Sequence, residues 1–330
     1  MEDQQTENTT SEATRLTQGR VTALILGLGL IIVSAVLATA WARPPEAPAI
    51  IPAAAAQPFN DPASPDNSHD GAETPAQVSL PESYRMDISF GDLGPQLLAA
   101  GAIDYDLFSQ LYQQMGQPLT ESQQAILTEG SDVPITFDYQ NAHFLLNFFW
   151  ALGLTNRNVI LTEGPMVQQS DGDIGSYAST GGWTLGHHPA THLYASTPII
   201  SLTPDQQSRL EEAANNIYRP CCNNHTAFAD CNHGMAMLGL LELLASQDAS
   251  VEELFAAAKA VNGFWFPQQS LQTAVFFKAA MDLDYADVEP RLAVSRDTFS
   301  GSGFAQVQQW LANNGLLEQP PGGDGSCGVS

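Results

Sequence analysis

The sequence is poor in basic residues. It has 11 lysines and arginines among 330 residues, against 36 aspartates and glutamates, and its formal net charge is −25. Proteins that bind nucleic acid or anionic lipid surfaces hold the phosphates with lysine and arginine. We therefore expect no nucleic-acid partner, and the acidic balance favours solubility or the attraction of cations.

Several motifs that mark common chemistries are also missing. The chain has no G-x-S-x-G, no P-loop lysine motif and no dinucleotide fingerprint set between a strand and a helix, which removes the most frequent hydrolase, NTPase and dehydrogenase classes. It has neither paired C-x-x-C sequences nor the C-x-x-C-H that attaches c-type haem. Functional residues must therefore be sought outside these standard patterns.

Charged residues are absent from one long apolar stretch near the N-terminus. Residues 1–20 are polar and predict a disordered tail, whereas residues 21–42 carry no charge. At about 1.5 Å per residue, a helix of this length crosses a hydrocarbon core of about 30 Å. A cleaved signal peptide is the alternative, because residues 38–40 read Ala-Thr-Ala, but the apolar run is longer than a usual signal core. We expect an uncleaved, single-pass anchor.

The composition changes directly after this segment. Residues 43–83 are rich in proline, alanine, aspartate and serine, a composition typical of a solvated, disordered spacer. Most of the chain, with its cysteines, follows the anchor, and two arginines precede the anchor while Arg43 follows it. This bias is slight, but it favours a cytoplasmic N-terminus. We expect a cell-membrane protein with an extracytoplasmic C-terminal domain.

Residues 84–317 predict one mainly α-helical domain. Thr120, Thr203 and Ser250 each precede a glutamine or glutamate by three residues, which is the capping-box signature of a helix start. The second half of residues 138–154 is apolar on all sides and residues 235–244 are apolar almost all round, so both stretches predict buried helices. We expect Gly263 to end the helix that begins after Ser250.

Residues 156–198 predict a long irregular loop rich in glycine, serine and threonine, with strand-like runs at 159–161 and 198–200. Long irregular connections in compact domains are usually functional. The loop contains His187, His188 and His192, which either join a metal site or are exposed histidines without a role.

The cysteines gather in residues 218–234, which we call the cysteine loop. It contains Cys221, Cys222 and Cys231 together with His225 and His233. Asp230 or Asn232 is expected to cap a helix starting near Cys231, so that Cys231 and His233 lie in its first turn, where the helix dipole favours a thiolate. Soft ligands this close together predict a metal or redox site.

The metal is not identified by this spacing, and zinc, copper and iron–sulfur remain open. The fourth cysteine, Cys327, lies in a glycine-rich tail at 318–330 and is expected to be tethered to the cysteine loop as a ligand or a disulfide partner. Two structural disulfides are the alternative, because the number of cysteines is even and the expected compartment is oxidising.

Three functions follow from these residues. The first is a membrane-anchored extracytoplasmic module whose metal or redox site uses Cys221, Cys222, Cys231 and His233, with His225 or Cys327 as auxiliary ligands. The second is a disulfide-stabilised helical scaffold whose acidic surface meets a protein partner of a membrane complex. The third, ranked last, is an enzyme with Cys231 as nucleophile, for which the scattered histidines define no roles.

Overall fold

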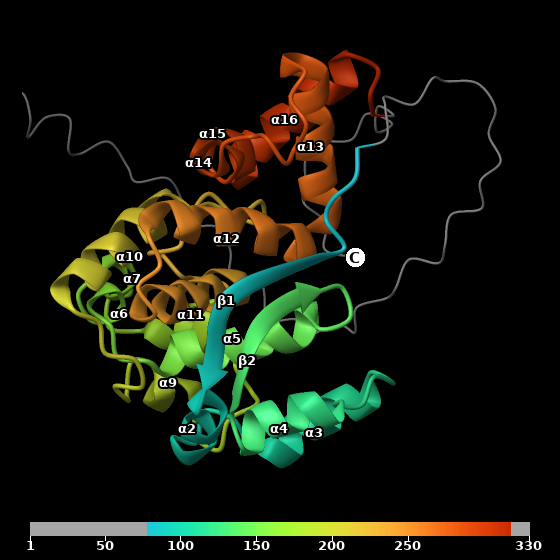
Figure 1. The fold of residues 1–330 in the computed structure, drawn as a ribbon. Helices are drawn as coiled ribbons and strands as arrows, with labels where there is room; N and C mark the ends of the chain where they lie inside the picture. Colours follow the sequence, from blue (N-terminus) through green and yellow to red (C-terminus); the bar gives the residue numbers. More distant parts are fainter. Residues whose placement is uncertain (1–77, 318–330) are drawn as a thin grey trace, which may run out of the picture. The chain divides into compact units, whose positions relative to one another are not determined.

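The computed structural model describes residues 78–317 (Figure 1). The predicted tail at 1–20, the anchor at 21–42, most of the spacer and the 318–330 tail with Cys327 lie outside the described residues. The described region is 57% helix, which confirms the mainly helical class. Within residues 78–317, no helix combines the length and the apolar character needed to cross a membrane.

Helices and two strands make up the described region. In chain order they are β1 (Ser83–Gly91), α2 (Leu93–Ala99), α3 (Tyr105–Gln114), α4 (Glu121–Thr128), β2 (Ser131–Asp138), α5 (Ala142–Thr155), α6 (Val159–Thr162), α7 (Pro165–Gln169), η1 (Ile174–Ser176), α8 (Ala178–Gly181), α9 (Ala190–Leu193), α10 (Pro204–Asn216), α11 (Asn232–Ser246), α12 (Val251–Trp265), α13 (Pro267–Met281), α14 (Pro290–Ala293), α15 (Arg296–Phe299) and α16 (Gly301–Asn313).

A two-stranded antiparallel sheet was not predicted. β1 pairs with β2 although α2, α3 and α4 separate them in the chain, and the two strands run side by side in Figure 1. Met86, Ile88 and Phe90 alternate toward the core, which is the period-two pattern of a half-buried strand. The pattern was therefore present in the sequence, and the first strand begins at Ser83.

The centre of the core is the pair α5 and α11. Both helices are buried along most of their length, as predicted. They cross closely at two glycines: a Cβ on Gly153 would lie 2.1 Å from Met235 O, and one on Gly239 would lie 2.5 Å from Phe149 O. Trp265 contacts both N-terminal ends, because its Nε1 donates to Ala142 O and its ring lies 6.1 Å from that of His233.

The helix starts agree with the capping signals. Thr120, Thr203 and Ser250 form complete capping boxes at α4, α10 and α12. The predicted end of α12 at Gly263 is wrong: the helix continues to Trp265, and α13 begins at Pro267. Gly263 keeps a negative φ, so it does not adopt the left-handed conformation of a helix-ending glycine.

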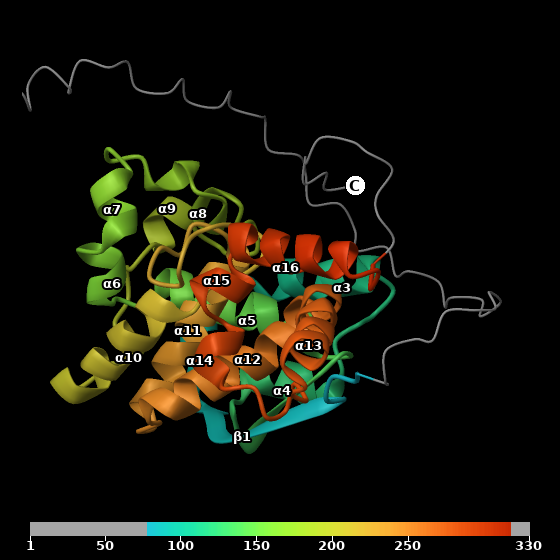
Figure 2. The same ribbon diagram turned by 90° about the horizontal axis from the view of Figure 1, so that it is seen from above.

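The predicted irregular loop at 156–198 contains short helices, α6 to α9 and η1, and Figure 2 shows α6, α7, α8 and α9 as one group of short helices. The strand-like run at 159–161 is helix α6, because the Asn158 side chain caps it by accepting from Ile160 N at 2.9 Å. The run at 198–200 forms no strand, and an isolated bridge between Thr197 and Asn156 precedes it.

Candidate metal centre

Three sulfur atoms converge at the start of α11. The Sγ atoms of Cys221, Cys222 and Cys231 all lie within 4.8 Å of one another, and Cys221 Sγ is 3.7 Å from Cys231 Sγ. Cys221 is exposed, while Cys222 and Cys231 are partly buried. Among residues 78–317, these three side chains form the group of potential metal ligands close enough to share one ion.

The described cysteines are not joined by disulfides. Cys221, Cys222 and Cys231 are free, and 3.7 Å between the sulfurs of Cys221 and Cys231 is far beyond the bond length of about 2.0 Å. Cys327, the proposed fourth ligand or disulfide partner, lies outside the described residues. Its tethering stays a prediction.

The loop is bent back on itself by backbone contacts. Tyr218 and His225 form an antiparallel bridge, which closes the turn that carries Cys221 and Cys222. The turn is also fixed to the start of α16, because Gly301 N donates to Cys222 O at 2.7 Å and Ser302 N donates to the Asn223 side chain at 2.7 Å. The sequence analysis did not predict this contact with α16.

Cys231 itself caps α11. Its backbone is extended and its Sγ accepts from Gly234 N at 3.4 Å, so the prediction that Asp230 or Asn232 caps the helix is wrong. Asp230 is held elsewhere, because its carboxylate accepts from Arg219 and, at 2.9 Å, from Asn224 Nδ2. His233 does lie in the first turn, as predicted.

Arg219 is the residue of the site that sequence reasoning missed. Its side chain is 3% exposed, and its guanidinium donates to Cys231 Sγ at 2.9 Å, to Asn224 O and Phe228 O at 3.1 Å, and to the Asp230 carboxylate. A Cβ at position 234 would lie 2.5 Å from Arg219 Cζ. Gly234 is therefore required for the guanidinium to lie against the helix start.

These contacts favour Cys231 as the ionised sulfur. Hydrogen bonds from the thiols of Cys221 and Cys222 lower the pKa of Cys231 well below its usual value, and the charge of Arg219 acts in the same direction against the effect of burial. Hydrogen bonds with Cys222 and with Cys231 raise the pKa of Cys221. Burial tends to lower the pKa of Arg219, but the surrounding anions outweigh it, so the guanidinium remains a cation.

The two histidines of the loop lie outside the group of three sulfurs. The His233 ring packs on Phe266, with ring centroids 4.5 Å apart, and its Nδ1 lies 2.9 Å from Asn232 Oδ1. His225 Nδ1 is buried without a hydrogen-bond partner. Burial lowers the pKa of His225, and lowers that of His233 to about 4. Both side chains are therefore neutral at neutral pH.

The histidines of the 156–198 segment lie elsewhere. His187, His188 and His192 are exposed, and His187 Nδ1 contacts Asp104 Oδ2 at 2.8 Å. None of them belongs to the three-sulfur group. The structure therefore does not bring them together with the cysteines.

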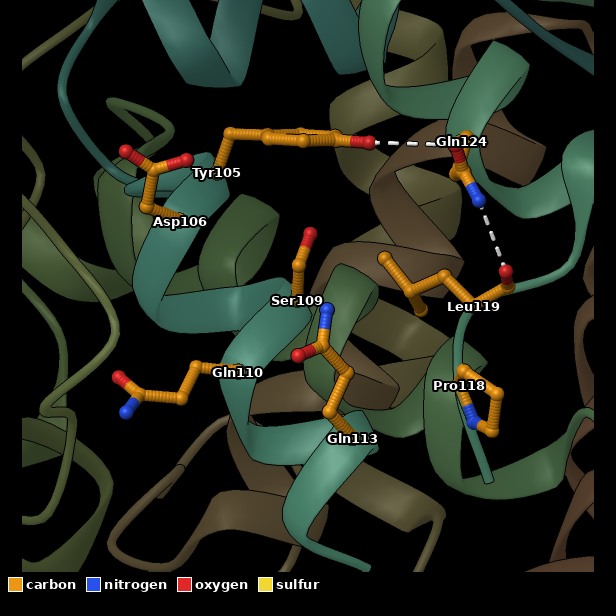
Figure 3. Close-up of a pocket in the computed structure, with 8 residues that line it drawn as sticks. All are labelled: Tyr105, Asp106, Ser109, Gln110, Gln113, Pro118, Leu119 and Gln124. Atoms are coloured by element: carbon orange, nitrogen blue, oxygen red, sulfur yellow. Dashed lines mark hydrogen bonds between the residues drawn. The ribbon is translucent and has the colours of Figure 1, made fainter. Parts of the chain in front are cut away.

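A separate polar groove of about 500 Å³ lies between α3 and α4 (Figure 3). Its lining includes Tyr105, Ser109, Gln113 and Gln124, and no cysteine or histidine. Tyr105 Oη donates to Gln124 Oε1 at 3.4 Å, and Gln124 Nε2 donates to Leu119 O at 2.9 Å. The groove therefore offers amide and hydroxyl groups but no soft ligand.

Comparisons with family models, with curated proteins and with solved structures find no match to this chain. The function is therefore inferred from the geometry of the cysteine loop.

Proposed function

We propose that this chain is a membrane-anchored, extracytoplasmic module that binds a soft metal ion through Cys221, Cys222 and Cys231. The observation that carries the proposal is the convergence of three sulfurs within 4.8 Å. Thiolates are the ligands that soft ions such as copper(I) prefer, and zinc and iron–sulfur clusters also use them.

The sulfur spacing supports a shared ion. Two thiolates bound tetrahedrally to one ion at about 2.3 Å lie about 3.8 Å apart. The 3.7 Å between Cys221 and Cys231 is close to that separation. An ion could therefore be bound with little movement of these two side chains.

The surroundings of Cys231 support the same function. Hydrogen bonds and charges around a ligand orient it and tune the metal it holds. Arg219 Nε and Gly234 N both donate to Cys231 Sγ, and the arginine stabilises the thiolate, which is the form that binds metal. Cys231 is thus the preorganised ligand, and the turn supplies Cys221 and Cys222.

The cellular setting is part of the proposal. The uncharged segment at 21–42 would anchor the chain and the spacer at 43–83 would hold the domain away from the bilayer. A net charge of −25 raises the local concentration of cations around the domain. The alternative, a disulfide-stabilised scaffold for a protein partner, requires bonds that the three described cysteines do not form.

Elemental analysis combined with thiol counting tests this function. The full chain, purified in detergent, should contain one soft metal ion per chain, and its thiols should react slowly with a probe until a chelator is added. Cys231→Ser should lose the metal, whereas His192→Ala, at an exposed histidine outside the sulfur group, should retain it. Equal metal content in the Cys231→Ser variant and the parent would refute the proposal.

A further inference from the structure

We infer that the three sulfurs form a site for a three-coordinate thiophilic centre, the class that includes Cu(I) and As(III), and that no further side chain of residues 78–317 completes it. This inference rests on the proposed function, because it names the kind of ion that Cys221, Cys222 and Cys231 hold. It differs from a four-coordinate zinc site, which would need a fourth ligand.

The carboxylate of Asp230 is held by other partners. Asp230 is adjacent to Cys231 in the chain, but its two oxygens accept hydrogen bonds from Arg219 and from Asn224 Nδ2. Releasing Asp230 to bind an ion would remove one of the anions that compensate the charge of Arg219, which is 3% exposed. An uncompensated buried charge is strongly destabilising, so Asp230 is a partner of the arginine and not a metal ligand.

The nearest imidazole is held away from the sulfurs. His233 lies two residues after Cys231, yet its ring packs on Phe266 and its Nδ1 faces the Asn232 side chain. His225 packs against Tyr218, with ring centroids 6.1 Å apart. Neither histidine belongs to the group whose ligand atoms lie within 4.8 Å of one another.

The hydrogen bonds around Cys231 fix the orientation of this ligand. Its sulfur accepts from Arg219 Nε at 2.9 Å and from Gly234 N at 3.4 Å. The guanidinium and the helix start thus cover one side of this sulfur, while Cys221 lies 3.7 Å from it. An ion bound among the three sulfurs would be held by Cys231 on one side, and the sulfur of Cys231 would keep its hydrogen bonds from Arg219 and Gly234.

The binding reactions balance without an oxidant or a reductant. Cu(I) forms three Cu–S bonds as the thiols that are still protonated lose their protons to solvent. Arsenous acid forms three As–S bonds, and each hydroxide that leaves takes one proton, so that three neutral thiols would give three waters. No electron is transferred in either case.

The net charge of the bound site differs between the two ions. Arg219 and Asp230 neutralise each other, so three thiolates with As(III) are neutral and with Cu(I) carry two negative charges.

The test uses the full chain in detergent, freed of metal and kept reduced. Cu(I), arsenite and Zn(II) are added separately, affinities are measured by competition with a chromophoric chelator or a dithiol, and X-ray absorption counts the ligands. Cu(I), arsenite or both should bind with a shell of three sulfurs. Cys221→Ser, Cys222→Ser and Cys231→Ser should each lower that affinity at least a hundredfold.

The control variants decide the coordination number. His225→Ala and His233→Ala should each change the affinity less than threefold and leave the shell at three sulfurs, with circular dichroism confirming the fold. A four-sulfur shell that loses one sulfur in Cys327→Ser would overturn the three-coordinate site. A tenfold loss in either histidine variant, or a zinc shell with a fourth protein donor, would overturn this inference while leaving the proposed function intact. If none of the three ions binds, both fail.

Discussion

Arg219 links the chemistry of the site to its stability. Its guanidinium bonds the Cys231 sulfur, the Asp230 carboxylate and two carbonyls of the loop, so it fixes the loop around the helix start. The sequence predicted the cysteines because sulfur ligands are rare and clustered. It could not identify Arg219, because the hydrogen-bond partners that mark a buried guanidinium as part of a site come together only when the loop is folded.

Replacing Arg219 should therefore be costly. Arg219→Met keeps an unbranched apolar stem but leaves Asp230 and the Cys231 thiolate without their cation, so the free energy of unfolding should fall by about 3–5 kcal/mol. The measurement is urea unfolding at pH 7. Arg85→Met, in the exposed pair of Arg85 and Asp87, is the control and should change stability little. Equal effects of the two variants would show that Arg219 is not a structural anchor.

Glu242 predicts a dependence of stability on pH. It is fully buried in α11 with neither carboxylate oxygen hydrogen-bonded, and burial raises its pKa from 4.5 to about 8 although Asn156 acts in the opposite direction. Between these values the folded chain holds a proton that the unfolded chain has lost. Its contribution to stability is therefore fully present below pH 4.5 and is lost as the pH rises through 8, by up to about 1.4 kcal/mol per pH unit.

Glu242→Gln should remove this dependence. Urea unfolding between pH 6.5 and 9 avoids most of the histidine titration, and the parent should lose stability up to about pH 8 more steeply than the variant. The variant should also be the more stable protein at pH 9, because it buries no charge. Parallel stability curves for parent and variant would mean that Glu242 does not titrate in this range.

At the scale of elements, the helix starts were predictable and the packing was not. Capping boxes at Thr120, Thr203 and Ser250 are local signals that tertiary contacts did not change. Gly263 is also a local signal, but α12 continues past it into the aromatic residues and ends at Trp265. The close approach of α5 and α11 depends on two glycines far apart in the chain, which no local pattern pairs.

Two glycine-to-alanine substitutions should have opposite effects. Gly239→Ala would place a Cβ 2.5 Å from Phe149 O on α5, and the helices must separate, at a cost of about 1–3 kcal/mol or more. Gly263→Ala meets no atom within 4 Å and should stabilise α12 by about 0.5–1 kcal/mol. Thermal unfolding of both variants measures the difference. A Gly239→Ala variant as stable as the parent would contradict the close crossing.

At the scale of the whole molecule, the last residues of the expected spacer contact the domain. The composition placed the end of the spacer at residue 83, but β1 begins at Ser83. Val78 and Leu80 also pack against a cluster that includes Ala274, Phe277 and Val288. Composition could not locate this boundary, because residues 43–83 are rich in proline and alanine on average. Two apolar residues that contact the domain hardly change that average composition.

This boundary predicts which fragment is the more stable. Residues 78–317 should fold alone with a helical far-UV spectrum, because the described core lies within them. A fragment of residues 84–317 loses Val78, Leu80 and Ser83 and should melt at a lower temperature. Identical melting temperatures would show that residues 78–83 contribute nothing to the domain.

The binding of a soft ion by Cys221, Cys222 and Cys231 is tested most directly by the intact mass of the full chain. Native mass spectrometry in detergent should show one metal or metalloid ion per chain, and denaturation in acid should return the mass calculated for the fully reduced sequence. Metal-free protein whose mass is lower than the reduced sequence by two hydrogens per disulfide, under both conditions, would contradict the metal site and favour the disulfide-stabilised scaffold.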